Sequence, residues 1–113
     1  VPCSGNYYFD VVDWIFASGG LPVLAHPGLI KDQSIISTLL SYKPIGLEVY
    51  YGYWEQPQKK IDHYKRLSEN LNLFATGGSD FHGFFSKVEI GGVDIPKCCI
   101  ERLKAYLEIE RWY

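Results

Sequence analysis

The sequence predicts an α/β fold with about three parallel strands and flanking helices. Helical apolar periodicities alternate with short unbroken apolar runs, and turn residues follow each run. The length of 113 residues suits one compact domain, and 47% hydrophobic with 21% charged residues is typical of globular chains. Alternating units of this length place helices outside a parallel sheet.

The first half of the chain predicts two helix–strand units. Residues 7–18 have apolar side chains at helical spacing, and Gly19 follows where a helix needs a left-handed cap. Residues 21–25 are an unbroken apolar run, typical of a strand covered on both faces. Asp32 can cap a second helix, and residues 45–50 predict the second strand. The predicted buried stripe of the second helix consists of Ile35, Ile36, Leu39 and Leu40.

The second half predicts one more unit and a closing helix. Residues 56–71 place their apolar positions on one face, which predicts a helix. Residues 73–76 predict the third strand, closed by Gly77 and Gly78. A final helix is predicted after Pro96. Its inward-facing residues are predicted to be Ile100, Leu103 and Leu107.

Charge and hydropathy exclude several classes of protein. A net charge of −2 and a pI near 5.9 provide no general attraction to nucleic acid or anionic membranes. No apolar run approaches the roughly 20 residues that span a bilayer, and the start lacks the features of a secretory signal. We therefore expect a cytoplasmic protein without membrane contact. The cysteines are predicted to be reduced thiols, because the three are Cys3 and the adjacent pair Cys98 and Cys99.

Polar side chains follow each predicted strand. His26 follows the first strand, Glu48 lies near the end of the second, and Asp80 and His82 follow the third. Functional groups in parallel α/β folds gather at the carboxyl ends of the strands, so these residues are expected to share one pocket. In an extended segment the side chains of Asp80 and His82 would point to the same side, supplying a carboxylate and an imidazole to a divalent metal.

Each of these residues also has an ordinary structural interpretation. His26 precedes Pro27 in what could be a plain strand-to-loop turn, and Asp80 could cap a loop by bonding backbone amides. Glu48 could likewise bond loop amides rather than meet a ligand. Lys87 could meet a phosphate as a point charge, although most single lysines are solvated. His63, mid-helix among charged residues, is predicted to be a surface histidine.

An aromatic run follows the second strand and has two interpretations. The run could stack on a nucleobase, as in proteins that bind single-stranded nucleic acids, or serve as core and rim packing, which we favour. Its members are Tyr50, Tyr51, Tyr53 and Trp54.

Three motifs resemble those of PHP-type (polymerase and histidinol phosphatase) phosphoesterases, most closely the TrpH-like branch. They are residues 25–28 (AHPG), 46–49 (GLEV) and 76–83 (TGGSDFHG). The resemblance implies a distorted barrel of seven parallel strands, with residues 1–113 as the C-terminal part of that domain. It also implies up to three divalent ions (Mn, Zn or Fe), with His26, Asp80 and His82 each a ligand of a different one. The early His-x-His motif of such proteins is absent from this chain.

The resemblance implies hydrolysis of a phosphate ester, with a nucleotide or short oligonucleotide as substrate. Glu48 and Lys87 are then the predicted substrate-binding residues. Three loops supply too few ligands for a multinuclear site, so the chain alone is expected to be inactive. The chain contains no methionine and begins at Val1, which we interpret as a piece of a longer protein.

Two other functions compete with hydrolysis of a phosphate ester. The first is a metal-free interaction or regulatory module that keeps the scaffold. The second is a zinc amidohydrolase, which the Asp-Phe-His spacing of residues 80–82 disfavours. Three parallel strands without further strands would leave edges and an apolar face uncovered, so we expect the chain to self-associate.

Overall fold

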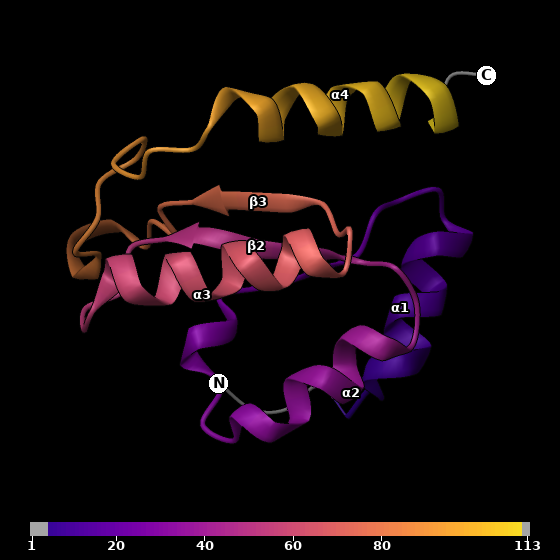
Figure 1. The fold of residues 1–113 in the computed structure, drawn as a ribbon, viewed down its shortest axis with the longest axis horizontal. Coiled ribbons are helices and arrows are strands. Elements are labelled where there is room, and N and C mark those ends of the chain that lie inside the picture. The colour runs from indigo at the N-terminus through magenta and orange to yellow at the C-terminus, as the bar shows by residue number, and fades with distance from the viewer. Residues whose placement is uncertain (1–4, 112–113) are drawn as a thin grey trace.

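The computed structural model describes residues 5–111 and contains four helices and three strands within them (Figure 1). In chain order they are α1 (Tyr8–Ala17), β1 (Val23–Leu24), α2 (Ile36–Ser41), β2 (Gly46–Tyr51), α3 (Pro57–Asn70), β3 (Ala75–Gly78) and α4 (Lys97–Arg111). Three short 3-10 turns lie between them, at Pro27–Leu29, Gln33–Ile35 and Gly83–Phe85.

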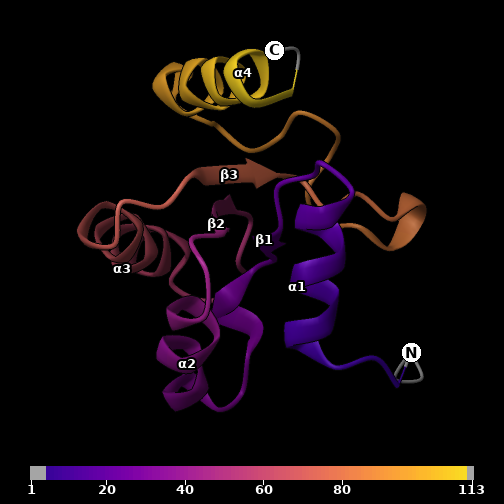
Figure 2. The same ribbon diagram turned by 90° about the vertical axis from the view of Figure 1, so that its right-hand side faces the viewer.

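The three strands form one open sheet in the order β1-β2-β3, and both pairings are parallel. The predicted α/β class with three parallel strands is therefore confirmed. Consecutive strands are neighbours, so each helix between them crosses the sheet in the same sense, and α2 and α3 lie on the same side (Figure 2). α1 lies on the β1 side of the molecule and α4 on the β3 side (Figures 1 and 2).

The core is centred on β2, the middle strand. Leu47 and Val49 are 0% exposed, and Ile45 just before the strand is 2% exposed. Burying an aliphatic side chain fully contributes about 1.5–3 kcal/mol, so this strand is the main source of apolar stabilisation. The helices and the β3 segment surround these residues with Val12, Ile36, Leu40, Tyr64 and Leu73.

The predicted helix ends are largely confirmed. Gly19 follows α1 with φ of 82°, the left-handed conformation expected there, and its N–H bonds to Phe16 O at 3.0 Å. Asp32 accepts a hydrogen bond from Ser34 N at 3.1 Å, which caps the turn leading into α2. Short-range signals of this kind depend on neighbouring residues only, which is why the sequence predicts them well.

Two predictions about the strands need correction. β1 is only two residues long and Val23 is 39% exposed, so residues 21–25 are not a strand covered on both faces. The third strand is Ala75–Gly78 rather than residues 73–76, so Gly77 lies inside it and Gly78 is its last residue. The reason is close packing, because a Cβ added to Gly77 would lie 2.5 Å from Tyr50 O in β2.

Two predicted core residues are exposed. Ile35 is 41% exposed because it belongs to the 3-10 turn Gln33–Ile35, whose three residues per turn rotate it away from the α-helical stripe. Ile100 is 47% exposed, although it lines the same small cavity between α4 and β3 as Cys99 and Leu103.

Cys98 and Cys99 are free thiols, and Cys3 lies outside the described residues. Among residues 5–111, no helix has the length and apolar character needed to cross a membrane.

Candidate functional site

Glu48 is the third of the six residues of β2 rather than near its end, and it ties this strand to the loop after β1. Its Oε1 atom accepts a hydrogen bond from the backbone N–H of His26 at 2.9 Å. The carboxylate therefore holds the loop that carries the predicted histidine ligand, which is the loop-amide role that the sequence left open. The prediction that Glu48 also contacts substrate remains a prediction.

Tyr51 lies between the loops that follow β1 and β3. Its hydroxyl donates a hydrogen bond to Asp80 Oδ2 at 2.8 Å, and the centroid of its ring is 5.1 Å from that of His26. Burial raises the pKa of Tyr51 to about 12, and the hydrogen bond to the Asp80 carboxylate adds to the shift. The hydroxyl is therefore protonated at neutral pH and acts as the donor to Asp80.

The segment containing Asp80 and His82 is turned rather than extended, which corrects the geometry expected from their spacing. Asp80 has φ of 52°, and His82 Nδ1 lies 2.5 Å from Asp80 O and 3.6 Å from Asp80 Oδ1. The backbone N–H of His82 donates to Ser86 Oγ. The two side chains are brought close by this turn, so the expected proximity holds for a different physical reason.

The hydrogen bond at His82 favours one tautomer. A proton on Nδ1 can be donated to the Asp80 carbonyl, which leaves the lone pair on Nε2. Histidines that bind metals commonly donate their second ring nitrogen to a carbonyl or carboxylate in this way. The His82 ring is also 69% exposed, so Nε2 is accessible to a ligand.

Two of the four non-glycine residues with positive φ in the described part of the chain are predicted site residues. His26 has φ of 24° and Asp80 has φ of 52°, both in the left-handed region that favours glycine. Such conformations cost of order 1–3 kcal/mol each and persist where the surrounding structure holds them. Tyr53 helps to hold the His26 loop, because its hydroxyl accepts the Gly28 N–H at 2.8 Å and its ring packs on that glycine.

The structure joins the predicted residues into one series of contacts without forming a complete metal shell. Glu48 bonds His26, the His26 ring contacts Tyr51, and Tyr51 bonds Asp80, which is adjacent to His82. Within residues 5–111, no group of three or more His, Cys, Asp or Glu side chains could hold a metal ion. The donors are of the right kind, but they do not fit a metal by themselves, and ligation by His26, Asp80 and His82 remains a prediction.

Tyr51 is the site residue that sequence reasoning missed. The sequence places it in the aromatic run, and the structure separates that run by burial. Tyr50 and Tyr53 are 8% and 4% exposed and belong to the core, whereas Trp54 is 73% exposed. A usable signal is the position of Tyr51, which is the last residue of β2 and so lies where functional groups gather.

The two remaining predicted residues lie on the surface. Lys87 follows β3, and its Nζ lies over the ring of Trp54. Its contact with substrate remains a prediction. His63 is an exposed side chain on α3, as predicted, and packs edge-on against Tyr64.

Comparison with known proteins supplies one informative match. The chain is 32% identical over 90 residues to phosphoribosyl 1,2-cyclic phosphate 1,2-diphosphodiesterase of Eggerthella lenta. The match covers 77% of this chain and 32% of the relative, so the chain spans about a third of the length of the curated relative that it matches. No family model and no solved structure matches the chain. The chain is therefore a distant and partial homologue of this diphosphodiesterase.

Proposed function

We propose that this chain forms part of the active site of a metal-dependent phosphoesterase that hydrolyses a phosphate ester of a nucleotide or short oligonucleotide. The observation that carries the proposal is the series of contacts that runs from Glu48, within β2, through Tyr51 to Asp80 and joins the carboxyl ends of the three parallel strands. The partial homology to a phosphodiesterase supports it. In this proposal residues 1–113 are the C-terminal part of a longer domain, a PHP-type barrel of the TrpH-like branch.

In this proposal His26, Asp80 and His82 each contribute to a different divalent ion, with Mn, Zn or Fe as candidates. Bound ions would supply an activated water and neutralise charge on the phosphate. The residues of this chain would act by position: Glu48 holds the His26 loop, and Tyr51 orients the Asp80 carboxylate. Further ligands would have to come from residues outside the described ones, because residues 5–111 do not complete a shell.

The first test is the coding sequence upstream of Val1. The proposal expects a His-x-His motif after a short strand, followed by further acids and histidines that complete the shell. An upstream sequence without them would contradict catalysis. It would favour the alternative function, a metal-free interaction or regulatory module that keeps this scaffold.

The second test uses the product of the complete reading frame with manganese and nucleotide substrates. Asp80→Ala should lower phosphate release by about 100-fold or more, because it removes a proposed metal ligand. His26→Ala and His82→Ala should each reduce bound metal measured by elemental analysis. Matched controls are Asp94→Ala and His63→Ala, which alter exposed residues of the same type elsewhere. Full metal content in both ligand variants, or unchanged activity in Asp80→Ala, would remove these residues from the site.

A further inference from the structure

A pocket beside the candidate site combines exposed aromatic rings with a positive charge. Its volume is about 310 Å³, and it lies between the loop after β2 and the loop after β3. The residues that line it are Tyr51, Trp54, Ser79, Asp80, His82, Phe85, Ser86, Lys87 and Val88. It therefore includes Asp80 and His82, the predicted metal ligands after β3, together with Trp54 and Phe85, to which the proposed function gives no role.

The aromatic residues of this pocket are unusually open. Trp54 is 73% exposed and Phe85 is 95% exposed, although both are large apolar rings. Exposed aromatics at the rim of a polar pocket commonly mark ligand-binding surfaces, because contact with a planar ligand removes their faces from water. Of the aromatic run that follows β2, Tyr50 and Tyr53 are buried in the core and Tyr51 is half-buried, so Trp54 is its most exposed member.

The polar groups of the pocket suit an anion attached to a planar ring. Lys87 Nζ lies over the Trp54 ring, which places a cation beside an aromatic face. Ser86 Oγ accepts from the His82 backbone N–H, so its own proton can be donated to a ligand oxygen. The negative charge of the Asp80 carboxylate would repel an anion in the same pocket. The positive charge of Lys87 and the hydrogen bond from the Tyr51 hydroxyl to Asp80 offset this negative charge.

We propose that Trp54, Phe85 and Lys87 form the subsite for a nucleoside monophosphate unit of the substrate. The base stacks against Trp54 and Phe85, and a phosphate oxygen pairs with Lys87 Nζ. Stacking on aromatic side chains is tolerant of base identity, so the subsite selects for the presence of a base more than for its type. This inference rests on the proposed function, since it names the substrate class of the same site.

The test measures binding to the product of the complete reading frame by calorimetry without metal, using adenosine monophosphate and ribose 5-phosphate as probes. The two probes share the sugar phosphate and differ in the base. This protein should bind adenosine monophosphate about tenfold or more tightly than ribose 5-phosphate. Trp54→Ala and Phe85→Ala should remove most of that preference, whereas Lys87→Ala should weaken both probes.

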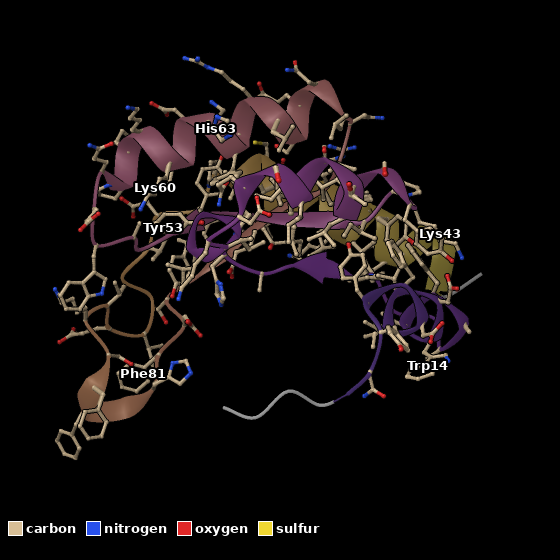
Figure 3. The ribbon with its side chains drawn as sticks, turned by 90° about the horizontal axis from the view of Figure 1, so that it is seen from below. Trp14, Lys43, Tyr53, Lys60, His63 and Phe81 are labelled. Carbon is tan, nitrogen blue, oxygen red and sulfur yellow. The ribbon has the colours of Figure 1, made fainter. Side chains whose placement is uncertain are left out.

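Two matched controls isolate the subsite. Trp14→Ala alters an exposed tryptophan on α1, far from the loop that carries Phe81 (Figure 3), and should leave both affinities unchanged. Phe84 is the fully exposed neighbour of Phe85, but it does not line the pocket. Phe84→Ala should therefore also leave both affinities unchanged. Circular dichroism of each variant confirms that it is folded.

The outcomes separate this inference from the proposed function. Equal affinity for the two probes, or a loss in the control variants as large as in Trp54→Ala, overturns the base subsite and leaves the phosphoesterase proposal standing. A preference for adenosine monophosphate that depends on Trp54 supports the subsite. Unchanged activity in Asp80→Ala would overturn only the proposal of hydrolysis at this site. The binding preference would still support the base subsite in that case.

Discussion

At the residue scale, one tyrosine connects what the sequence places far apart. Tyr51 contacts His26, which is 25 positions earlier, and donates to Asp80, which is 29 positions later. Neither separation along the sequence corresponds to a helix or strand periodicity that a sequence pattern could reveal. Such contacts exist because parallel strands bring their carboxyl ends to the same edge of a sheet.

Tyr51→Phe tests this connection through stability. The variant loses the hydrogen bond to Asp80 Oδ2, so the free energy of unfolding should fall by about 0.5–1.5 kcal/mol in urea denaturation at pH 7. Tyr42→Phe is a matched control, because its hydroxyl donates to the exposed Asp13 carboxylate away from the site. An equal loss of unfolding free energy in Tyr42→Phe would show that the hydrogen bond from Tyr51 to Asp80 stabilises the fold no more than an exposed one does.

The pH dependence of stability follows from the same side chain. The pKa of Tyr51 is raised to about 12 when folded, against an ordinary value near 10. The unfolded chain therefore loses this proton first as the pH rises, so the contribution is complete below pH 10 and is lost between about 10 and 12. Burial raises Tyr50 and Tyr53 to pKa values of about 12 as well. The free energy of unfolding should therefore fall between about pH 10 and 12, and it should fall less steeply in Tyr51→Phe. An equally steep fall in the variant would contradict a raised pKa of Tyr51.

At the element scale, close contacts between elements decide which residues each one tolerates. β3 runs against β2 with Gly77 opposite Tyr50, and α4 is attached to the turn before β3 by Arg102. These are contacts between segments that are remote in sequence. The contact between β2 and β3 explains why Gly77, which looks like a strand terminator in the sequence, lies inside the strand.

Gly77→Ala should destabilise the sheet. The added Cβ would lie 2.5 Å from Tyr50 O and 2.6 Å from Tyr50 Cβ, so β2 and β3 must move apart. We expect a loss of about 1–3 kcal/mol in the free energy of unfolding. Gly78→Ala is the matched control, since the nearest atom to its added Cβ, Glu48 Oε2, would be 4.0 Å away. Equal stability of the two variants would contradict the close approach of β2 and β3 at Gly77.

Arg102 should hold α4 on the sheet. Its guanidinium donates to Leu73 O at 3.1 Å and to Asn72 Oδ1 at 3.0 Å, and it packs over the Phe74 ring. Arg102→Ala should speed amide hydrogen exchange in α4 by about tenfold or more while leaving α3 unchanged. Lys104→Ala, an exposed substitution on the same helix, should have no such effect. Unchanged exchange in Arg102→Ala would assign the docking of α4 to its apolar contacts alone.

At the scale of the whole molecule, large apolar side chains remain in contact with water at both ends. Val23 is 39% exposed in the edge strand β1, and Trp14 is 56% exposed on α1. Phe84 and Phe85 are almost fully exposed on the loop after β3. Figure 3 places Trp14 and the loop of Phe81 at opposite ends of the molecule. A parallel sheet of three strands also has two edges whose backbone groups can pair with another chain.

We therefore expect self-association of the 113-residue chain, with two copies covering each other's exposed sheet surfaces. Light scattering should give a mass of at least a dimer at micromolar concentration. Val23→Lys should shift the equilibrium toward the monomer, because a charge on an edge strand opposes pairing. Thr38→Lys, an exposed change on α2, should not. A monodisperse monomer of the unmodified chain would contradict this prediction.

The sequence by itself determined the fold class, the order of the elements, and the helix signals at Gly19 and Asp32. These depend on periodicity and on neighbours within a few residues, which a linear pattern contains. It also indicated that His26 and Asp80 lie at strand ends. Only the tertiary structure decided that Gly77 continues β3, that Ile35 faces water, and that Tyr51 links the strand ends. Those outcomes depend on which remote segments touch, and hydrophobic pattern alone does not specify such contacts.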